Sequence, residues 1–393
     1  MVINIMKRII ISSICIITIG ALLIYNAPKV IEDNFVEKRS IFISYIELSE
    51  YLSNRSVDDS KRNIDLMIKN VKKLGFNEII LQVRSFCDAI YDSKIYPYSM
   101  MVSSSEGVSP GYDILEYFLD KAHKNGITLI AWINPYRVRN SSDISSISDK
   151  SPVYKYLKSD ILYVSDGIYL NPSKEETRKL IVEGVEEIVK NYDVDGILFD
   201  DYFYPNNEID RDDYNKYLQN NEYISKEQYN LNTVSMMIKE VHDVCTEREV
   251  LFGISPDGNM ENNYNKVYAD VKKWCSSDEY IDFIMPQVYY GFYNETKPFK
   301  EVIDEWESII IDDDVKLYVA LAFYKVGEVD KYAKSGKEEW LNNSDIIMRE
   351  IIASRNLNKY QGFSLFRYDY IFNNSKHNEI SVAEIENMKK VLN

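Results

Sequence analysis

Short runs of β-branched and aromatic residues alternate with helical patterns along this chain of 393 residues. The strand-like runs lie at residues 40–48, 77–84, 127–136, 196–202, 250–256, 283–290, 316–325 and 362–370. The helical patterns lie at about residues 60–75, 112–125, 173–191, 228–245, 263–275, 299–310, 344–355 and 380–392. Most of the runs are almost continuously apolar, which is typical of parallel strands buried on both faces. Eight alternating units predict an α/β fold, the closed (β/α)8 TIM barrel.

The N-terminus carries a separate signal. Lys7 and Arg8 precede an uncharged run over residues 9–28. This run is longer than the apolar region of most signal peptides and approaches the length that spans a bilayer. We expect a signal-anchor/transmembrane segment over residues 1–28, with its two cations on the cytoplasmic side. A short linker over 29–39 and the barrel over 40–393 would follow. A cleaved signal peptide is the alternative, and either reading places the barrel outside the cytoplasm.

Composition excludes several classes of partner and cofactor. The net charge of −16 argues against nucleic acid, which is bound chiefly through basic surfaces. The three histidines do not cluster with carboxylates, so a zinc site is not expected. The chain has no P-loop and no G-x-G-x-x-G motif. We therefore expect no metal and no organic cofactor.

Long loops are expected on one end of the barrel. Residues 137–172, 203–227 and 326–343 all follow the C-terminal ends of predicted strands, and the returning connections are shorter. TIM-barrel sites are built from the loops at this end. The long insertions therefore favour an extended groove for a large substrate.

Hydrogen-bonding side chains cluster near the ends of five successive strands. Side chains two residues apart point to the same face of a strand. The resulting pairs are Gln82 with Arg84, Asn134 with Tyr136, Asp200 with Tyr202, Ser255 with Asp257, and Gln287 with Tyr289. Because unpartnered polar groups are costly to bury, such a ring is either a closed polar network or a ligand site.

Asp200 is the strongest candidate for a functional carboxylate, because it ends a buried strand at the mouth of the barrel. Asp201 has the opposite parity, so it could point towards the helices and only orient its neighbour. Glycoside hydrolysis needs two carboxyl groups, one as acid and one as nucleophile or base. We do not expect these two neighbours to form that pair. The candidate partners of Asp200 are Asp88, Asp257, Glu261, Glu295 and Asp369.

Two further patterns bear on carbohydrate chemistry. Tyrosines fall at or just after the strand ends, at positions 136, 202, 204, 289, 290, 293, 324 and 368. Their rings can stack on sugars, although core packing and an AT-rich codon bias are the alternative explanations. The segment DGILFDDY resembles the chitinase pattern DGxDxDxE, but Tyr202 stands where that pattern has its catalytic glutamate. Chitinase-type substrate assistance is therefore not supported by the motif.

Six segments together resemble one known family. They are FNEIILQVRSFCDAIYDSKIYPYS (76–99), AHKNGITLIAWINPYRV (122–138), YDVDGILFDDYFYP (192–205), FGISPDG (252–258), YADVKKW (268–274) and YIDFIMPQVYY (280–290). In this order they resemble the glycosyl-hydrolase-like (β/α)8 barrel family that includes the bacterial divisome-localised glycosyl hydrolase. The resemblance implies a barrel outside the cytoplasm that acts on glycan. For the divisome member that glycan is peptidoglycan stripped of its peptides.

The resemblance also implies a set of site residues. It carries over to Arg84, Asp88, Asn134, Tyr136, Arg137, Asp200, Asp201, Tyr202, Gln287 and Tyr289. The chain departs from the family at Asp257, where an aromatic residue is usual, and at Tyr98 and Tyr290, which replace common tryptophans. These departures lie near the predicted mouth, so they bear on the substrate more than on the fold.

We therefore predict a membrane-anchored, extracytoplasmic glycoside hydrolase of the cell wall that needs no cofactor. The predicted catalytic residues are Asp200, Asp201 and Asp88. The predicted substrate-binding residues are Arg84, Asn134, Tyr136, Arg137, Tyr202, Asp257, Gln287 and Tyr289. The alternatives are a non-catalytic glycan-binding protein on the same fold and a hydrolase of another secreted polysaccharide.

Overall fold

The computed structural model describes residues 35–392. The signal-anchor predicted for residues 1–28 lies outside this range, as does most of the predicted linker. From residue 35 to residue 392, no helix combines the length and apolar character that crossing a bilayer would require. The described chain forms one compact unit from Glu37 onward.

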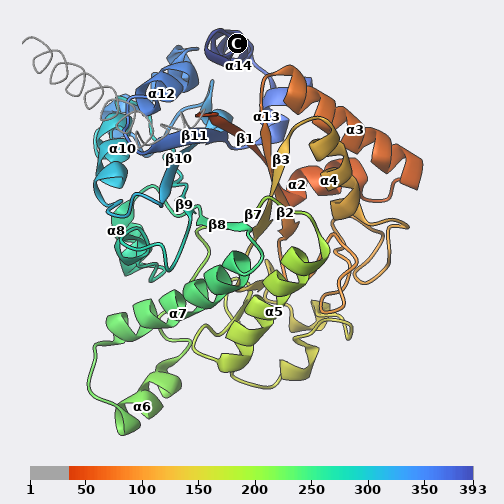
Figure 1. Cartoon of the computed structure of the whole chain (residues 1–393), viewed down its shortest axis with the longest axis vertical. Helices are drawn as coiled ribbons and strands as arrows, with labels where there is room; N and C mark the ends of the chain where they lie inside the picture. The colour runs from red at the N-terminus through yellow and green to blue at the C-terminus, as the bar shows by residue number, and fades with distance from the viewer. Residues whose placement is uncertain (1–34, 393) are drawn as a thin grey trace, which may run out of the picture. The chain divides into compact units, whose positions relative to one another are not determined.

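A closed barrel of eight parallel strands forms the centre of this unit, as predicted (Figure 1). The spatial order of the strands is β1-β11-β10-β9-β8-β7-β3-β2. Their bounds are β1 Lys38–Ile43, β2 Glu78–Arg84, β3 Thr128–Ile133, β7 Gly196–Phe199, β8 Leu251–Ile254, β9 Phe283–Ile284, β10 Lys316–Leu321 and β11 Tyr360–Leu365. The sequence-predicted (β/α)8 fold is thus confirmed.

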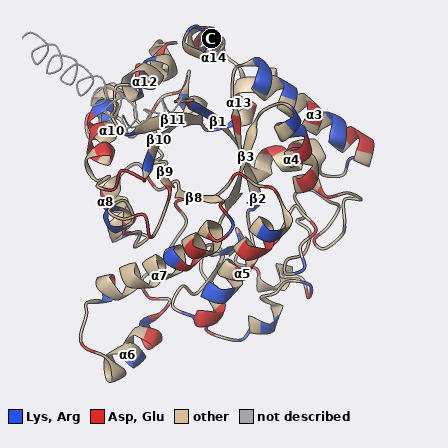
Figure 2. Ribbon diagram, in the orientation of Figure 1, with Lys and Arg blue, Asp and Glu red and all other residues tan. Residues whose placement is uncertain are grey.

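Helices surround the ring of strands (Figure 1). Those of eight or more residues are α2 Tyr45–Leu52, α3 Val57–Lys73, α4 Ile114–Lys124, α5 Glu175–Asn191, α6 Arg211–Asn220, α7 Lys226–Thr246, α10 Phe299–Ser308, α12 Ile346–Ser354 and α14 Glu379–Leu392. The shorter ones are α8 Met260–Asn265, α9 Val271–Trp274, α11 Glu339–Asn342 and α13 Tyr368–Phe372. Figure 2 shows charged residues along these helices, while the strands between them are largely uncharged.

The predicted long loops carry structure of their own. The loop after β3 contains a small antiparallel sheet of β4 (Arg137–Arg139), β5 (Leu162–Val164) and β6 (Ile168–Leu170). The loop after β7 contains α6, and the loop after β10 contains α11. All three loops follow the C-terminal ends of barrel strands, so this end carries the larger insertions.

Two elements differ from the sequence-based expectation. Strand β1 stops at Ile43, because Ser44 caps helix α2 by accepting a hydrogen bond from the backbone N–H of Ile46 at 3.2 Å. Residues 45–48 are therefore helical and not extended. The single helix expected over residues 263–275 is split into α8 and α9, because Tyr268 adopts left-handed backbone with φ of 52°.

Strand β2 contains an irregularity that changes which side chains face the barrel interior. Gln82 pairs with Trp132 of β3, whereas Arg84 pairs with the next residue, Ile133. Val83 is therefore an extra residue on β2, as in a β-bulge. Because alternation of side chains is interrupted there, Gln82 and Arg84 do not share a face.

Apolar side chains fill the interior of the barrel below its C-terminal end. The interior cluster consists of Phe42, Ile80, Ile130, Trp132, Leu198, Phe283, Met285, Tyr318 and Ala320. At the opposite end, the Glu78 carboxylate accepts hydrogen bonds from Ser40 at 2.6 Å and Thr128 at 3.0 Å. The packed centre leaves room for a ligand only where the strands end.

Candidate active site

A cavity of about 260 Å³ lies at the C-terminal end of the barrel. Its lining comes from all eight barrel strands or the residues that follow them, and from the start of α2. The lining residues are Phe42, Ser44, Tyr45, Ile46, Gln82, Trp132, Arg137, Asp200, Asp201, Tyr202, Ser255, Gln287, Tyr289, Tyr324 and Phe366. This position is where TIM-barrel enzymes build their active sites.

Asp200 follows the last residue of β7 and is buried. Its Oδ2 accepts hydrogen bonds from Trp132 Nε1 at 3.0 Å and from Asn134 Nδ2. Its Oδ1 accepts a bond from the backbone N–H of Tyr202 at 3.2 Å. Burial raises the pKa of Asp200, and the positive charge of Arg137 together with these three donors opposes that rise.

Asp201 lines the same cavity and has a different environment. Burial, followed by the charge of Asp200, raises its pKa to about 7, with only partial opposition from hydrogen bonds that include the Gln287 amide. Since donors favour the ionised form, the proton that the two aspartates share near neutral pH resides on Asp201. The pair therefore offers one proton donor and one carboxylate.

Arg137 supplies positive charge at the cavity wall. Its Nε donates to the backbone oxygen of Ser85 at 3.1 Å, and its Nη2 donates to Asn134 Oδ1 at 3.3 Å. The guanidinium carbon lies 4.9 Å from the ring centres of both Tyr202 and Phe86. These contacts hold the cation near Asp200 without a direct salt bridge to it.

A chain of hydrogen bonds supports Asp200 from the first strands of the barrel. The backbone N–H of Tyr45 donates to Gln82 Oε1 at 2.9 Å, and Gln82 Nε2 donates to Asn134 Oδ1. Asn134 in turn donates to Asp200. Asn134 therefore orients the carboxylate and does not itself line the cavity.

Aromatic rings form the opposite wall. Tyr289 packs edge-on against Tyr324 with ring centres 5.8 Å apart, and lies 5.9 Å from Phe366. Tyr45 and Tyr202 stand at the rim, where Tyr202 is 50% exposed. Rings of this kind can stack on the apolar faces of sugars, and the phenol hydroxyls can bond sugar hydroxyls.

Four of the eight predicted binding residues do not line the cavity: Asn134, which supports Asp200, together with Asp257, Arg84 and Tyr136. Because of the bulge in β2, the Arg84 side chain is buried outside the barrel, with its guanidinium 4.0 Å from the Tyr96 ring centre and against Gly184 of α5. Tyr136 is buried in the layer between strands and helices. It lies beyond the end of β3 at Ile133, so parity along the strand no longer fixes its direction.

The predicted partner carboxylates do not line the cavity either. Asp88 is buried and accepts a bond from the backbone N–H of Phe86 at 3.3 Å. Asp257 accepts bonds from the backbone N–H of Asn259 at 2.8 Å and from Asn262 Nδ2 at 2.7 Å. The cavity lining also contains none of Glu261, Glu295 and Asp369. Asp201, which parity directed towards the helices, is instead beside Asp200, because both residues lie past the end of β7.

Sequence reasoning missed several lining residues. Trp132 lies in an apolar strand and shares the parity of Asn134, and this signal could identify it as a lining residue. The sequence pattern predicts a strand at Tyr45, and this expectation hides its position at the cavity rim. Phe42, Ile46 and Phe366 carry no signal that separates them from core residues.

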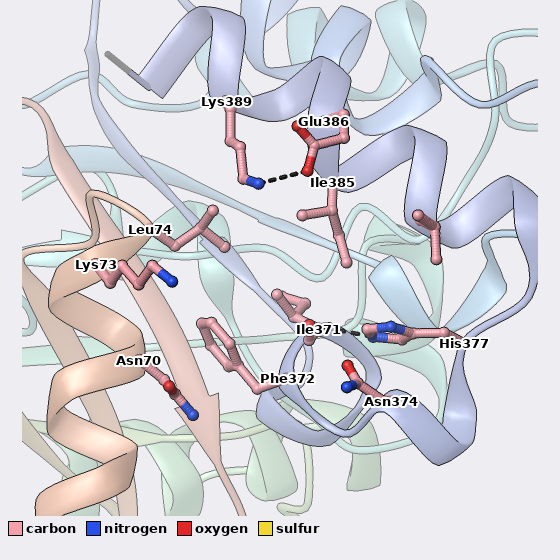
Figure 3. A pocket seen from close by; sticks show the side chains of 11 residues that line it. Asn70, Lys73, Leu74, Ile371, Phe372, Asn374, His377, Ile385, Glu386 and Lys389 are labelled. Carbon is pink, nitrogen blue, oxygen red and sulfur yellow. Dashed lines mark hydrogen bonds and ion pairs between the residues drawn. The ribbon is translucent and has the colours of Figure 1, made fainter.

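A second depression, of about 520 Å³, lies among the outer helices (Figure 3). Its lining comes from α3, α13, α14 and the turn between the last two: Asn70, Lys73, Leu74, Ile371, Phe372, Asn374, His377, Val382, Ile385, Glu386 and Lys389. Its one carboxylate, on Glu386, already pairs with Lys389 at 2.5 Å. Although it is larger, it offers no carboxyl pair. Within residues 35–392, no group of three or more His, Cys, Asp or Glu side chains is placed to hold a metal ion.

Adjacent carboxyl groups of unequal pKa, enclosed by aromatic rings at the C-terminal face of a barrel, are suited to glycoside hydrolysis. The fold and the site together define a barrel of the glycoside hydrolase class. Residues 37–338 match the model of the family described as glycosyl hydrolase-like 10, and the chain belongs to this family. Its membership confirms the resemblance seen in the sequence and assigns the chain to the glycoside hydrolases.

Relatives at about 30% identity extend over most of the chain. Glycosyl hydrolase YngK of Bacillus subtilis (strain 168) is 29% identical over 351 residues, which are 83% of this chain and 67% of YngK. Glycosyl hydrolase DigH of Escherichia coli O6:H1 is 31% identical over 334 residues, which are 77% of this chain and 74% of DigH.

Solved structures of low identity share the fold. The glycoside hydrolase domain of PgaB (BpsB) from Bordetella bronchiseptica has a TM-score of 0.57 and 11% identity, covering 90% of this chain and 99% of that domain. The catalytic domain of β-amylase from Paenibacillus polymyxa has a TM-score of 0.54 and 11% identity, covering 91% of this chain and 98% of that domain.

Proposed function

We propose that this protein is a membrane-anchored, extracytoplasmic glycoside hydrolase that cleaves the glycan strands of peptidoglycan. The observation that carries the catalytic part of this proposal is the placement of Asp200 and Asp201 in one aromatic-walled cavity. Their unequal surroundings supply the two protonation states that acid-catalysed cleavage of a glycosidic bond requires.

Asp201 acts as the general acid. With its pKa raised to about 7, it holds a proton at and below neutral pH and can deliver it to the leaving oxygen. Asp200, with three hydrogen-bond donors and Arg137 nearby, remains ionised and stabilises the positive charge that develops on the sugar. Arg137, Tyr202, Gln287 and Tyr289 bind the sugar.

A polymeric substrate is supported by the surface beside the cavity. A shallower depression of about 350 Å³ shares Tyr324 with the cavity and continues over the loop after β10 to Tyr332. The Tyr332 side chain is 86% exposed, which leaves its ring free to stack on a further sugar. A chain of sugars held in the cavity would extend along this loop.

The choice of peptidoglycan and of location is supported by sequence. The family resemblance implies a glycan of the cell wall. Lys7, Arg8 and the uncharged run over residues 9–28 support an anchor with the barrel on the outer side of the membrane. The surplus of acidic residues, with a net charge of −16, gives no support to a nucleic-acid partner.

Incubation of the full-length chain, in detergent, with purified peptidoglycan tests the proposal. Intact peptidoglycan and strands stripped of their stem peptides are compared, and released fragments are separated by mass. Asp200→Asn and Asp201→Asn should each lower the rate by roughly 10²–10⁴-fold, the range for a lost acid–base group. Asp193→Asn is the matched control, because Asp193 lies just before β7 and its side chain is exposed.

Release of fragments by the wild type and the control, but not by the two site variants, supports the proposal. Strand binding without release from either preparation would contradict it in favour of a non-catalytic glycan-binding protein. If the protein released fragments from another secreted polysaccharide but not from peptidoglycan, it would still be a glycoside hydrolase, and peptidoglycan would be rejected as its substrate.

A further inference from the structure

The two cavity aspartates project from a single wall, which limits what they can do together. They are consecutive residues, so their Cα atoms lie about 3.8 Å apart. Hydrolysis by two enzyme carboxylates places one at the leaving oxygen and the other across the sugar ring. If Asp201 faces the leaving oxygen, Asp200 lies beside Asp201 and not on the opposite face of the sugar ring.

The wall that faces Asp200 and Asp201 contains no carboxylate among the described lining residues. In the closed barrel β11 is four strands away from β7 in either direction, so it lies opposite. This side contributes Phe366 after β11, Tyr324 after β10, and Ser44 and Tyr45 after β1. Phe366 has no nucleophilic atom, and the hydroxyls of the other three side chains are weaker nucleophiles than a carboxylate unless a base activates them.

The carboxylates that lie behind this wall are already engaged. Glu47 is fully buried, pairs with Arg367 and accepts a bond from the backbone N–H of Ser44 at 3.0 Å. Asp369 is also fully buried, and accepts bonds from Tyr51 at 2.9 Å and from Lys376 at 2.7 Å. Both stabilise the loops that carry the wall, and neither reaches the cavity.

Asp200 retains room for one more hydrogen-bond donor. A carboxylate has about four acceptor positions, and three are filled by Trp132, Asn134 and the backbone of Tyr202. A substrate N–H next to the reacting carbon would fill the fourth. This leaves the cavity with a proton donor at Asp201, an acceptor for an N–H at Asp200, and no carboxylate nucleophile opposite them among the described lining residues.

We propose that the substrate supplies the nucleophile, as the carbonyl oxygen of a 2-acetamido group on the sugar whose glycosidic bond is cleaved. This inference rests on the proposed function and specifies its substrate class. Asp200 accepts the amide N–H, and the carbonyl oxygen forms a bond to C1. The C1–O bond to the leaving sugar breaks as Asp201 gives its proton to the leaving oxygen.

The second step regenerates the enzyme. The product of the first step is a cyclic oxazolinium ion, formed within the sugar and stabilised by the Asp200 carboxylate. Water attacks C1, the ionised Asp201 accepts the proton of that water, and the bond between C1 and the carbonyl oxygen breaks. The acetamido group and the acid are restored, and the anomeric configuration is retained. In the chitinase pattern the catalytic residue is a glutamate at the position that Tyr202 occupies in this chain. Here the neighbouring Asp201 is the catalytic acid.

Chemical editing of the substrate tests this inference on the wild-type protein. Peptide-free glycan strands are N-deacetylated, and portions are then re-acylated with acetyl or with trifluoroacetyl groups. We expect cleavage of the untreated and re-acetylated strands, and no cleavage of the deacetylated strands. Fluorine withdraws electrons from the carbonyl oxygen, so trifluoroacetyl strands should lose roughly 100-fold or more in kcat, the scale of a lost catalytic group, with KM little changed.

The outcomes separate the two proposals. Equal cleavage of acetyl and trifluoroacetyl strands, or inversion at the anomeric carbon, would overturn substrate assistance while hydrolysis itself stood. Failure to cleave even the untreated strands would overturn the proposed function, and this inference with it.

Discussion

The indole Nε1 of Trp132 lies 3.0 Å from Oδ2 of Asp200, so a side chain of the barrel interior orients the carboxylate at its mouth. Trp132 is itself held by Phe42, whose ring packs edge-on with centres 5.4 Å apart. The packed core thus helps to set the direction of Asp200, together with Asn134 and the backbone of Tyr202. Sites supported by rigid elements hold their geometry more closely than sites on loops.

Trp132→Phe should reduce kcat by about tenfold, because the Asp200 carboxylate loses one of its three donors and its orientation loosens. Steady-state kinetics on peptide-free strands measure the effect. Trp274→Phe is the control, since it also removes a buried indole donor, to Ser235 at 3.0 Å, away from the cavity. Equal losses in the two variants would show that packing alone is responsible.

The activity should fall as pH rises above about 7. Asp201 must be protonated to act as the acid, and its pKa is raised to about 7, so the protonated fraction falls about tenfold for each further pH unit. A profile of kcat between pH 5 and pH 9 measures this limb. The Asp201→Asn variant should have low activity that does not fall further above pH 7. An undiminished wild-type rate at pH 9 would exclude Asp201 as the acid.

On the acidic side of the pH profile, kcat falls as Asp200 becomes protonated. Arg137→Gln should shift this fall to higher pH. The charge of Arg137 lowers the pKa of Asp200, so its removal lets burial raise that pKa further and Asp200 becomes protonated earlier as pH falls. We expect kcat at pH 6 to drop by about 10–100-fold. Arg178→Gln, which removes an arginine bonded to Glu240 between α5 and α7, should leave this fall in place.

Glu384→Gln should stabilise the protein at pH 8. Glu384 on α14 is buried, and burial, assisted by the like charge of Asp345, raises its pKa from 4.5 to about 7. Because the folded state binds this proton more tightly than the unfolded state, wild-type stability falls as pH rises from about 4.5 to about 7. Neutral glutamine avoids that loss, which is about 2–3 kcal/mol at pH 8 and fades towards pH 4.5.

Urea denaturation at pH 5 and pH 8 measures this difference. Glu386→Gln on the same helix is the control, because that side chain is exposed and pairs with Lys389. A gain for Glu384→Gln of the same size at both pH values would contradict the explanation by proton linkage.

Gly184→Ala should destabilise the barrel even though alanine favours helices by about 1 kcal/mol. A Cβ at this position of α5 would lie 2.3 Å from Arg84 Nη1 and 2.6 Å from the Tyr96 hydroxyl, and both side chains are buried. Overpacking of this kind costs about 1–3 kcal/mol. Thermal unfolding measures the change, and Glu183→Ala, at the exposed neighbouring position, should have little effect.

The fold was predictable because eight buried strands alternate with helices, a pattern that neighbouring residues specify locally. The ends of the strands were less predictable. Tyr45 follows a strand-like run, yet the cap formed by Ser44 begins a helix there. Tyr268 breaks an otherwise continuous helical pattern through its left-handed backbone.

The site was only partly predictable from strand parity. Gln82 lies within β2 and lines the cavity as expected, and Asp200 and Gln287 also line it although they lie past the ends of β7 and β9. Arg84 does not, because the extra residue Val83 reverses its direction. Asp201 reaches the cavity because β7 has already ended, and alternation of side chains holds only within a strand.

The barrel closes through a pair of strands from the two ends of the fold, with Arg39 of β1 beside Phe363 of β11. A nascent chain therefore cannot complete the ring until β11 has been synthesised. Until then β1 and β10 both present unpaired edges, which are prone to pair with other chains. Any product that terminates before β11 should thus persist as an aggregation-prone open sheet and not as a smaller working enzyme.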